Sequence, residues 1–413
     1  MLVPERDQVR FETYCLEETL AADHPARTIW AALGKLDLSA FYAPLRARGS
    51  APGRPATDPR LLAALWLLGA TEGVGSAREI ARLCGRDDAY RWLCGGVPVN
   101  HHALGDFRVS HEAALDGLLS QAIAALVYKG LVRVTRVSQD GTRLRASAGM
   151  RSMTRRETLE KQLAEARRHV RRLKLQGEGE VSAREAAATE RAAREKMERL
   201  EAALEAVAEI QARKDGQKEK PSRKREALAS KTDPEARLMR MPGGGTRPAY
   251  NVQLATDVES RAIVGVSVTN EGSDARLSEP MRRQAEARTG ARASEWLMDG
   301  GYVGLGSLEA AAAEGVTVYA PVPKAKRKDG DRHAPRETDG PGVAEWRARM
   351  KTEEAKAIYK KRASTSETVN ADLKTHRGLG PLTVRGLAKV KCAALWSALA
   401  YNLLHFGGAL IGA

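Results

Sequence analysis

A long helical segment interrupts the part of the chain that carries strand-like patterns. Between residues 154 and 213, apolar residues recur three and four positions apart in two runs, Leu159 to Leu173 and Met197 to Val207. That spacing predicts two helices with heptad-like seams, and the Gly-Glu-Gly segment at 177–179 lies where a helical hairpin can reverse. We therefore predict an antiparallel helical arm, with a dimeric coiled coil as the alternative, inserted into a domain that also contains strands.

Alternation of apolar and polar residues predicts strands on both sides of this arm. Residues 131–138 alternate over eight positions and residues 142–146 alternate again. We interpret them as a hairpin whose first strand ends at Asp140. The later elements are predicted, in order, as strands at 250–257 and 262–268, a helix at 274–288, a strand at 295–299, a helix at 307–314 and a strand at 316–321. This order predicts an α/β layer structure.

Residues 10–130 have helical periodicity, for example in the apolar runs at 60–68 and 115–127. Between these runs, residues 76–93 form a short amphipathic helix, a glycine turn and a second short helix. This pattern fits a helix-turn-helix in which Arg86 and Arg91 contact DNA phosphates, and equally a plain helical hairpin in a bundle. The segment from Glu345 to the C-terminus is predicted to be helical, with a leucine stripe typical of a core helix.

The charge balance favours a polyanionic partner. The 413 residues include 67 Lys and Arg against 52 Asp and Glu, a formal net charge of +15. A solvated basic surface, or a composition in which Arg replaces Lys, would give the same excess. Two basic segments stand out, a predicted flexible linker at 214–231 and a predicted loop at 324–336 near DNA.

Cysteine usage and hydropathy indicate a reducing, cytosolic setting. The four cysteines are scattered without CxxC pairs or nearby histidines, so neither a zinc site nor a disulfide framework is predicted. The charged N-terminus is not a secretory signal. No uninterrupted apolar run approaches the roughly 20 residues that a membrane helix requires, so no membrane partner is expected.

Three acidic residues from separate parts of the chain could form one site. Asp140 and Asp299 each follow a short apolar strand and precede a glycine, and Glu367 lies in a helical segment. Carboxylate oxygens are preferred ligands of hard divalent cations, and two such ions can clamp the attacking and leaving oxygens of an in-line phosphoryl displacement. Any one of the three could instead serve a turn. Asp257 and Asp274 are interpreted as turn or helix-start residues.

Ordered sequence blocks carry a family resemblance. They are VSQDGT at 137–142, TDPEAR at 232–237 followed by YNVQ at 250–253, DGGY at 299–302, Y-x2-R-x4-E-x6-K at 359–374, RGLAKV at 385–390 and AYNLL at 400–404. Together they resemble the DDE transposases of bacterial insertion sequences, in the subfamily with a helical insert. The family signature Y-x2-R-x3-E-x6-K is one residue shorter, and the family's frequent aromatic-glycine pair is absent after Glu367. Glu353 and Glu354 therefore stay open as alternative third ligands.

The resemblance implies a ribonuclease H-like α/β catalytic domain, preceded by an all-helical domain and interrupted by a coiled-coil-like insert. The implied boundaries are 1–130 for the helical, DNA-binding domain, 131–153 for the first part of the catalytic domain, 154–231 for the insert and basic linker, and 232–413 for the remainder. It also implies a homo-oligomer on double-stranded DNA, both transposon ends and target, in the bacterial cytoplasm at the nucleoid.

The implied activity is Mg²⁺-dependent DNA strand cleavage and strand transfer at terminal inverted repeats. Asp140, Asp299 and Glu367 would be the catalytic metal ligands for two Mg²⁺, with Mn²⁺ able to substitute. By the same resemblance, Arg362 and Lys374 would hold phosphates of the transposon end, and Tyr359 would help to place the strand. The alternatives are an inactive or domesticated transposase-derived DNA-binding protein, and a nuclease of the same fold without strand transfer.

Overall fold

The computed structural model describes residues 13–45, 56–175, 183–216, 226–324 and 331–412. At its centre lies a six-stranded mixed sheet in the order β4-β5-β1-β7-β8, with β6 also paired to β5. The strands are β1 (Arg136–Arg145), β4 (Arg237–Arg240), β5 (Thr246–Asp257), β6 (Ile263–Thr269), β7 (Glu295–Leu297) and β8 (Thr317–Tyr319). Strands β1, β4 and β6 run antiparallel to β5, whereas β7 and β8 run parallel to β1.

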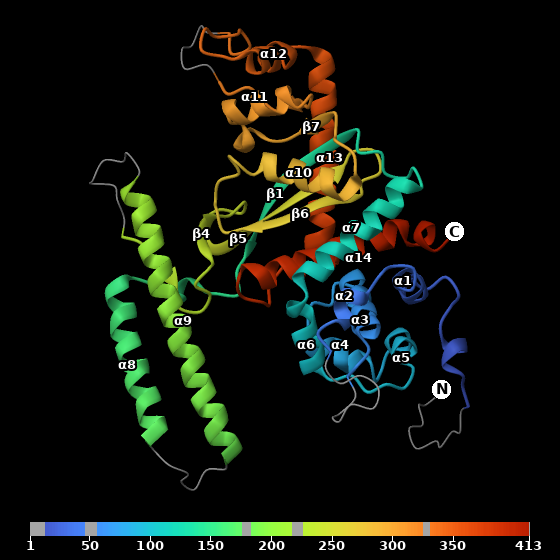
Figure 1. The fold of residues 1–413 in the computed structure, drawn as a ribbon, viewed down its shortest axis with the longest axis vertical. Coiled ribbons are helices and arrows are strands. Elements are labelled where there is room, and N and C mark those ends of the chain that lie inside the picture. Colours follow the sequence, from blue (N-terminus) through green and yellow to red (C-terminus); the bar gives the residue numbers. More distant parts are fainter. Residues whose placement is uncertain (1–12, 46–55, 176–182, 217–225, 325–330, 413) are drawn as a thin grey trace, which may run out of the picture.

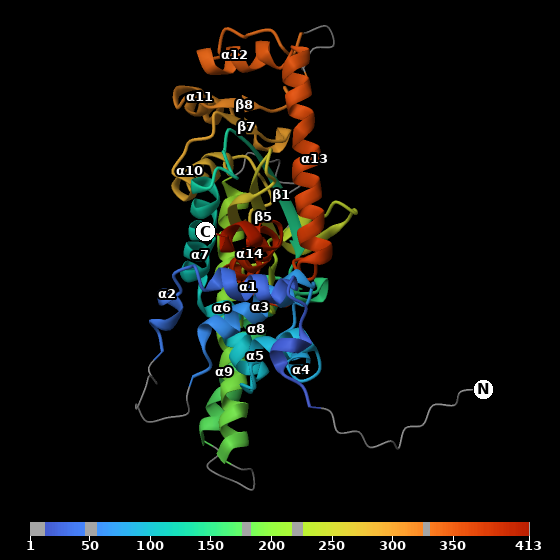
Figure 2. The ribbon, with the colours of Figure 1, turned by 90° about the vertical axis from the view of Figure 1, so that its right-hand side faces the viewer.

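Helices cover both faces of the sheet (Figure 2). Helix α13 (Glu353–His376) crosses one face over β1 and β5, and α10 (Ser278–Thr289) packs on β6 from the other side, next to α7 (Glu112–Tyr128). With both faces covered, β5 is buried over its last ten residues, from Pro248 to Asp257. Two further helices, α11 (Leu305–Ala313) and α12 (Pro341–Arg349), pack together beside β8 at the top of Figure 1.

The predicted hairpin at residues 131–146 is wrong. One continuous strand, β1, begins at Arg136 and carries Asp140 in its middle. The preceding segment is a loop in which the backbone amides of Leu131 and Val132 donate to the carbonyl of Leu126, and Val134 has a φ of +54°. Val132 and Val134 lie on this loop, and both side chains are buried in the core. The alternation of apolar and polar residues here therefore marks a loop that packs on the core, and not a strand.

The N-terminal region is helical throughout its regular structure and packs on the C-terminal helix α14 (Leu387–Ile411). Its elements are the 3₁₀ turn η1 (Leu16–Thr19) and the helices α1 (Pro25–Leu33), α2 (Ser39–Tyr42), α3 (Pro59–Thr71), α4 (Ala77–Leu83), α5 (Asp88–Cys94), α6 (His101–Ser110) and α7. Helix α3 starts as its sequence predicts, because the Asp58 carboxylate accepts the Arg60 amide at 2.8 Å and Pro59 occupies the first turn.

Helix α14 joins the helical region to the sheet. It packs against α3 and α7 of the helical region and against β6 of the sheet (Figure 1), and its Asn402 side chain exchanges two hydrogen bonds, each 3.0 Å, with the backbone of Ile263. Among the described helices it is the one long and apolar enough to cross a membrane, but 67% of that apolar window is buried inside the protein. The helix is buried on most of its circumference, well beyond the predicted leucine stripe.

The segment between β1 and β4 projects from the body as a helical pair (Figure 1). Helices α8 (Arg156–Leu175) and α9 (Ala183–Asp215) pack through a small apolar core that includes Leu159, Leu163 and Leu200. The short strands β2 (Met153–Thr154) and β3 (Ala229–Ser230) pair at the base of this arm, next to the 3₁₀ turn η2 (Met150–Ser152). The predicted reversal at 177–179 lies outside the described residues, as do the central parts of the two basic segments.

Candidate active site

Strand register brings two of the predicted acids together. In the parallel pair of β1 and β7, Ser138 lies opposite Leu297. Asp140 lies two residues after Ser138, and Asp299 lies two residues after Leu297. Both acidic side chains therefore leave the sheet at the same level and toward the same side. Strand β7 ends at Leu297, and Asp299 then caps the 3₁₀ turn η4 (Gly300–Tyr302) by accepting the Gly301 amide at 2.7 Å.

Helix α13 carries the third predicted acid to the same place. The hydroxyl of Ser366 lies 2.6 Å from that of Ser138, and the Asn370 amide donates to the Asp140 carboxylate at 2.9 Å. These buried contacts fix the helix over β1, and Glu367, which follows Ser366, faces the cavity. The cavity measures about 650 Å³ and is lined by Asp140, Gly141, Thr142, Arg143, Arg240, Met241, Pro242, Asp274, Asp299, Glu367, Asn370, Ala371 and Lys374.

A fourth carboxylate, that of Asp274, also lines this cavity. One of its oxygens accepts hydrogen bonds from the side-chain amides of Asn251 at 2.7 Å and Gln253 at 2.8 Å. The sequence predicts a turn or a helix start at Asp274. The helix start is wrong, because α10 begins at Ser278, but the turn is present, since the Leu277 amide donates to the Asp274 carbonyl at 3.0 Å. Sequence patterns do not predict that Asp274 lines the cavity. It lies on the loop that follows β6, and side-chain amides from another strand, β5, hold it there.

The absence of a side chain at Gly141 provides the space that the Asp274 carboxylate and its two amide partners occupy. A Cβ atom at this position would lie 2.3 Å from the Gln253 amide nitrogen, 2.9 Å from the Asn251 amide oxygen and 3.0 Å from the Asp274 carboxylate. Because successive side chains on a strand point to opposite faces, Asp140 faces α13 while Gly141 faces this cluster. The Asp-Gly pair at 140–141 therefore lets carboxylates approach β1 from both faces.

Buried amides connect this cluster to the loop that carries Asp299. The Gln253 side-chain oxygen accepts from the Tyr302 hydroxyl on η4 and from the Gln139 amide at 3.2 Å. Gln139 in turn accepts from the indole nitrogen of Trp296 on β7 at 3.0 Å. A hydrogen-bonded network under the cavity thus ties β5, β1 and β7 together, and it restrains the loop from Asp299 to Tyr302.

Burial dominates the electrostatics of Asp140. Its side chain is 19% exposed, and loss of solvent raises the pKa of the carboxyl to about 6. The nearby guanidinium of Arg362 opposes this rise in pKa, with Nη1 3.5 Å from Oδ1, whereas the charges of Asp299 and Asp274 add to it. Negative charge therefore accumulates around Asp140 beyond what Arg362 compensates.

The donor chemistry of the cavity fits a divalent cation. Four carboxylates supply oxygen ligands, and a buried carboxylate with a raised pKa gains from a neighbouring positive charge. Within the described residues, no three Asp, Glu, His or Cys side chains converge as closely as they would around an ion. The Arg362 guanidinium lies against Asp140 instead, and its Nη1 is buried without a hydrogen-bond partner.

The other predicted site residues lie at different distances from this centre. Lys374 lines the cavity, and Tyr359 lies under Arg362, whose guanidinium carbon is 5.9 Å from the ring centroid. The alternative ligands Glu353 and Glu354 are exposed in the first turn of α13, about 20 Å along the helix from Glu367 at 1.5 Å per residue. They do not line the cavity.

Arg86 and Arg91 lie in the helical region, apart from this cavity. Arg86 is exposed after α4, whereas Arg91 on α5 pairs with Asp88 at 3.0 Å and stacks over Tyr14 at 4.9 Å. Helices α4 and α5 both pack on α3 in the bundle. Of the two predicted phosphate contacts, Arg91 already has protein partners and Arg86 is directed to solvent.

Other blocks of the family resemblance support the fold around the site. The Tyr250 hydroxyl donates to the buried Asp233 carboxylate at 2.7 Å, which joins the segment after the arm to β5. Asp257, at the far end of β5, accepts from the amide and hydroxyl of Ser260 at 2.9 and 2.6 Å. Asp257 is therefore a turn residue, as its sequence context predicts.

Comparisons with known families agree with this site. Residues 221–403 match the model of the transposase DDE domain, and residues 14–110 match a second transposase domain. No curated protein and no solved structure matches the chain. The DDE domain implies a ribonuclease H-like fold, which the mixed sheet between helices resembles. The chain belongs to the DDE transposases of insertion sequences, a family of DNA-processing enzymes that use divalent metal ions. Strand β1 and the arm lie outside both matched segments.

Proposed function

We propose that this protein cuts DNA strands at the terminal inverted repeats of its element and joins the freed 3′ ends to target DNA. The observation that carries the proposal is the register of β1 and β7, which aligns Asp140 with Asp299 beside Glu367 in one cavity. A centre for phosphoryl transfer between DNA strands requires such converging carboxylates on rigid elements. The match to the DDE domain supports the same chemistry.

Asp140, Asp299 and Glu367 would hold two Mg²⁺, or Mn²⁺ in their place, and Asp274 would add a fourth carboxylate. When bound, the ions supply charge stabilisation for the attacking and leaving oxygens and activate the water that cuts the strand. The protein's own part is to keep the acids in place. Asn370 orients Asp140, the Gly301 amide orients Asp299, and the amides of β5 orient Asp274.

Basic side chains around the cavity would position the DNA backbone. Arg143, Arg240 and Lys374 line its wall. Arg362 has a buried Nη1 without a hydrogen-bond partner, and a phosphate oxygen would satisfy it while Tyr359 supports the guanidinium. An arginine fork can bind a phosphate through two parallel bonds, whereas lysine acts as a point charge.

The helical region at 1–130 would recognise the transposon ends, with Arg86 at its surface and Arg91 as a weaker candidate because of its protein partners. Two ends must be held together for joining, so we propose a homo-oligomer on DNA. The domain boundaries at 130, 153 and 231 follow from the same proposal, with the catalytic domain assembled from segments before and after the arm.

The test is cleavage and joining of labelled duplexes taken from the ends of the element, with purified protein and Mg²⁺. Asp140→Ala, Asp299→Ala and Glu367→Ala should each lower the cleavage rate at least about a thousandfold, because metal-assisted charge stabilisation contributes several kcal/mol. DNA binding in EDTA should persist in all three variants. Glu353→Ala is the matched control on the same helix and should cleave like the wild type.

Other outcomes of this test would indicate a different function or a different third metal ligand. DNA binding without cleavage by the wild type would indicate the inactive, binding-only alternative, and cleavage without joined products would indicate a nuclease. Full activity in the Glu367 variant, with loss in the Glu353 or Glu354 variant, would move the third ligand to the start of α13.

A further inference from the structure

One half of α8 carries only positive charge. Residues 167–174, RRHVRRLK, contain five Arg or Lys, one His and no acid, whereas residues 156–166, RETLEKQLAEA, contain two basic and three acidic residues. Arg168, Arg171 and Arg172 are exposed, while Val170 between them is buried against α9. The distal half of the arm therefore turns an arginine-rich face to solvent.

Most of these charges lack compensation. Arg167 pairs with Glu201 at 2.8 Å, but Arg168, Arg171 and Arg172 form no ion pair with any residue that the structure describes. Nearer the base of α8, by contrast, Arg156 pairs with Glu160 at 3.1 Å and Lys161 with Glu157 at 2.7 Å.

Helix stability does not account for this face. Like charges three and four residues apart, as between Arg168 and both Arg171 and Arg172, destabilise a helix by a few tenths of a kcal/mol each. Basic residues do favour a helix C-terminus, but that effect is confined to about the last turn, which begins at Arg172. Arg168 and Arg171 precede it.

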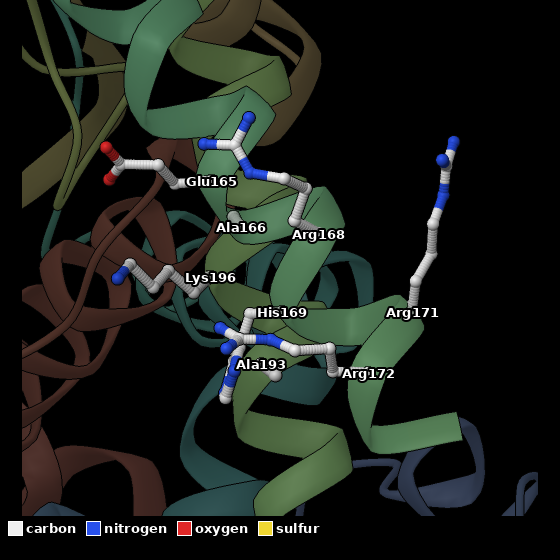
Figure 3. Close-up of a pocket in the computed structure, with 8 residues that line it drawn as sticks. All are labelled: Glu165, Ala166, Arg168, His169, Arg171, Arg172, Ala193 and Lys196. Atoms are coloured by element: carbon white, nitrogen blue, oxygen red, sulfur yellow. The ribbon is translucent and has the colours of Figure 1, made fainter. Parts of the chain in front are cut away.

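These side chains surround a hollow of about 630 Å³ between the two helices of the arm. Figure 3 shows Arg172 extending over His169 and Arg168 turned toward Glu165, while Arg171, which also lines the hollow, points in another direction from Arg172. Lys196 adds a positive charge from α9, and Glu165 is the one acid among the lining residues. The hollow thus offers several guanidinium groups that approach an anionic chain from different directions.

We propose that this face of the arm, formed by Arg168, His169, Arg171, Arg172 and Lys196, binds the phosphate backbone of duplex DNA. Exposed guanidinium groups bind phosphates through charge-assisted hydrogen bonds, and no base-reading surface is needed for such contacts. Residues 167–174 lie about 17 to 27 Å along α8 from its first residue, at 1.5 Å per residue. This face therefore lies toward the free end of the arm, so DNA bound there would be duplex outside the cavity.

This inference rests on the proposed DNA-processing function and adds a second contact to it. The cavity holds the strand to be cut, and the arm holds the neighbouring duplex by charge alone. The arm then contributes affinity and orientation without sequence preference, and its contribution falls steeply with salt because counterions are released from the phosphates.

The test compares two triple variants that each remove three positive charges from the arm. One is Arg168→Ala, Arg171→Ala, Arg172→Ala in the unpaired face. The matched control is Arg156→Ala, Lys161→Ala, Arg194→Ala, whose side chains are ion-paired to Glu160, Glu157 and Glu190. Fluorescence anisotropy with a mixed-sequence duplex of about 40 base pairs, in EDTA, gives affinity over a series of KCl concentrations.

The first variant should lose about tenfold or more in affinity, and the slope of log affinity against log salt should fall by about two to three. The control should change affinity less than about threefold. Equal losses in both variants, or no loss in either, would overturn the proposal. Light scattering of the free proteins tests whether this face instead binds a second copy of the chain. A change of oligomeric state in the first variant, with unchanged DNA affinity, would show that it does.

Failure of this inference is distinct from failure of the proposed function. If the wild type cleaves terminal DNA and the arginine variant binds duplex normally, only the arm proposal fails. If the wild type neither binds nor cleaves DNA, both fail. Thermal unfolding of the two variants checks that the arm is folded in each.

Discussion

The acids of the cavity and the arginines of α8 are both clusters of like charge, but the protein holds them in opposite ways. Asp140, Asp274 and Asp299 are fixed by hydrogen bonds from Asn370, from the amides of β5 and from the Gly301 backbone. Arg168 and Arg171 have no partner among the described residues and lie on an exposed helix.

This difference indicates two kinds of electrostatic work. In the cavity, burial raises the energy of the ionised Asp140 carboxylate, so a change of a single atom there should alter stability, pKa and activity together. On the arm, water and salt screen each charge, so substitutions should leave the folded protein unchanged and act only through what it binds. The experiments below test that contrast from its largest expected effect to its smallest.

Asp274→Asn should separate charge from hydrogen bonding in the cavity. The asparagine oxygen can still accept from Asn251 and Gln253, so the network should survive while one negative charge is lost. We expect cleavage and Mn²⁺ affinity to fall about 10- to 100-fold, the usual range for groups that support a metal site. Calorimetric titration of the protein with Mn²⁺ measures the affinity without DNA. Asp257→Asn is the control, since Asp257 is a more deeply buried acid at the end of β5 whose carboxylate serves a turn away from the cavity; a similar loss there would contradict a specific role for Asp274.

Gly141→Ala should test how tightly the two faces of β1 are packed. The new Cβ would meet the Gln253 nitrogen at 2.3 Å and the Asn251 oxygen at 2.9 Å, and neither amide can withdraw without losing its bond to Asp274. We expect a loss of about 1–3 kcal/mol in the free energy of unfolding, measured by urea denaturation. Gly149→Ala is the matched change, because nothing lies within 4 Å of a Cβ there. Equal stability of the two variants would show that the cluster is loosely packed.

The contrast between the two regions also explains what the sequence could predict. Asp140 and Asp299 follow short apolar strands, and because β1 and β7 are parallel neighbours, their proximity follows from local patterns plus family resemblance. Asp274 could not be found this way, since a loop and two amides from another strand hold it. The false strand at 131–135 had a related cause: Val132 and Val134 alternate because both anchor a loop in the core, and alternation alone cannot distinguish that from a strand.

Asp140→Asn should stabilise the metal-free protein at alkaline pH. Burial raises the pKa of Asp140 to about 6, so the ionised carboxylate costs stability above that pH and costs nothing once the group is protonated in both folded and unfolded states, below about pH 4. We expect a gain of about 1–3 kcal/mol at pH 8 that vanishes toward pH 4. Thermal unfolding across this pH range in EDTA measures it. A gain that is the same at all pH values would mean that ionisation of Asp140 is not its cause. A loss of stability at pH 8 would show that the attraction between the Asp140 carboxylate and Arg362 outweighs the cost of burying that carboxylate.

The triple arginine variant of α8 should change the free energy of unfolding least, although it removes the most charge. Replacing Arg168, Arg171 and Arg172 with alanine removes three charges, but each side chain is exposed and unpaired within the described part of the chain, and alanine is the better helix former. The free energy of unfolding should therefore stay within about 0.5 kcal/mol of the wild type, or rise slightly as repulsion along α8 is relieved. Urea denaturation at low and high salt measures this, and relief of repulsion predicts that any gain shrinks as salt increases. A clear destabilisation would mean that these arginines hold the arm to another part of the protein, and the distinction between a charge cluster built into the fold and one left free for DNA would no longer hold.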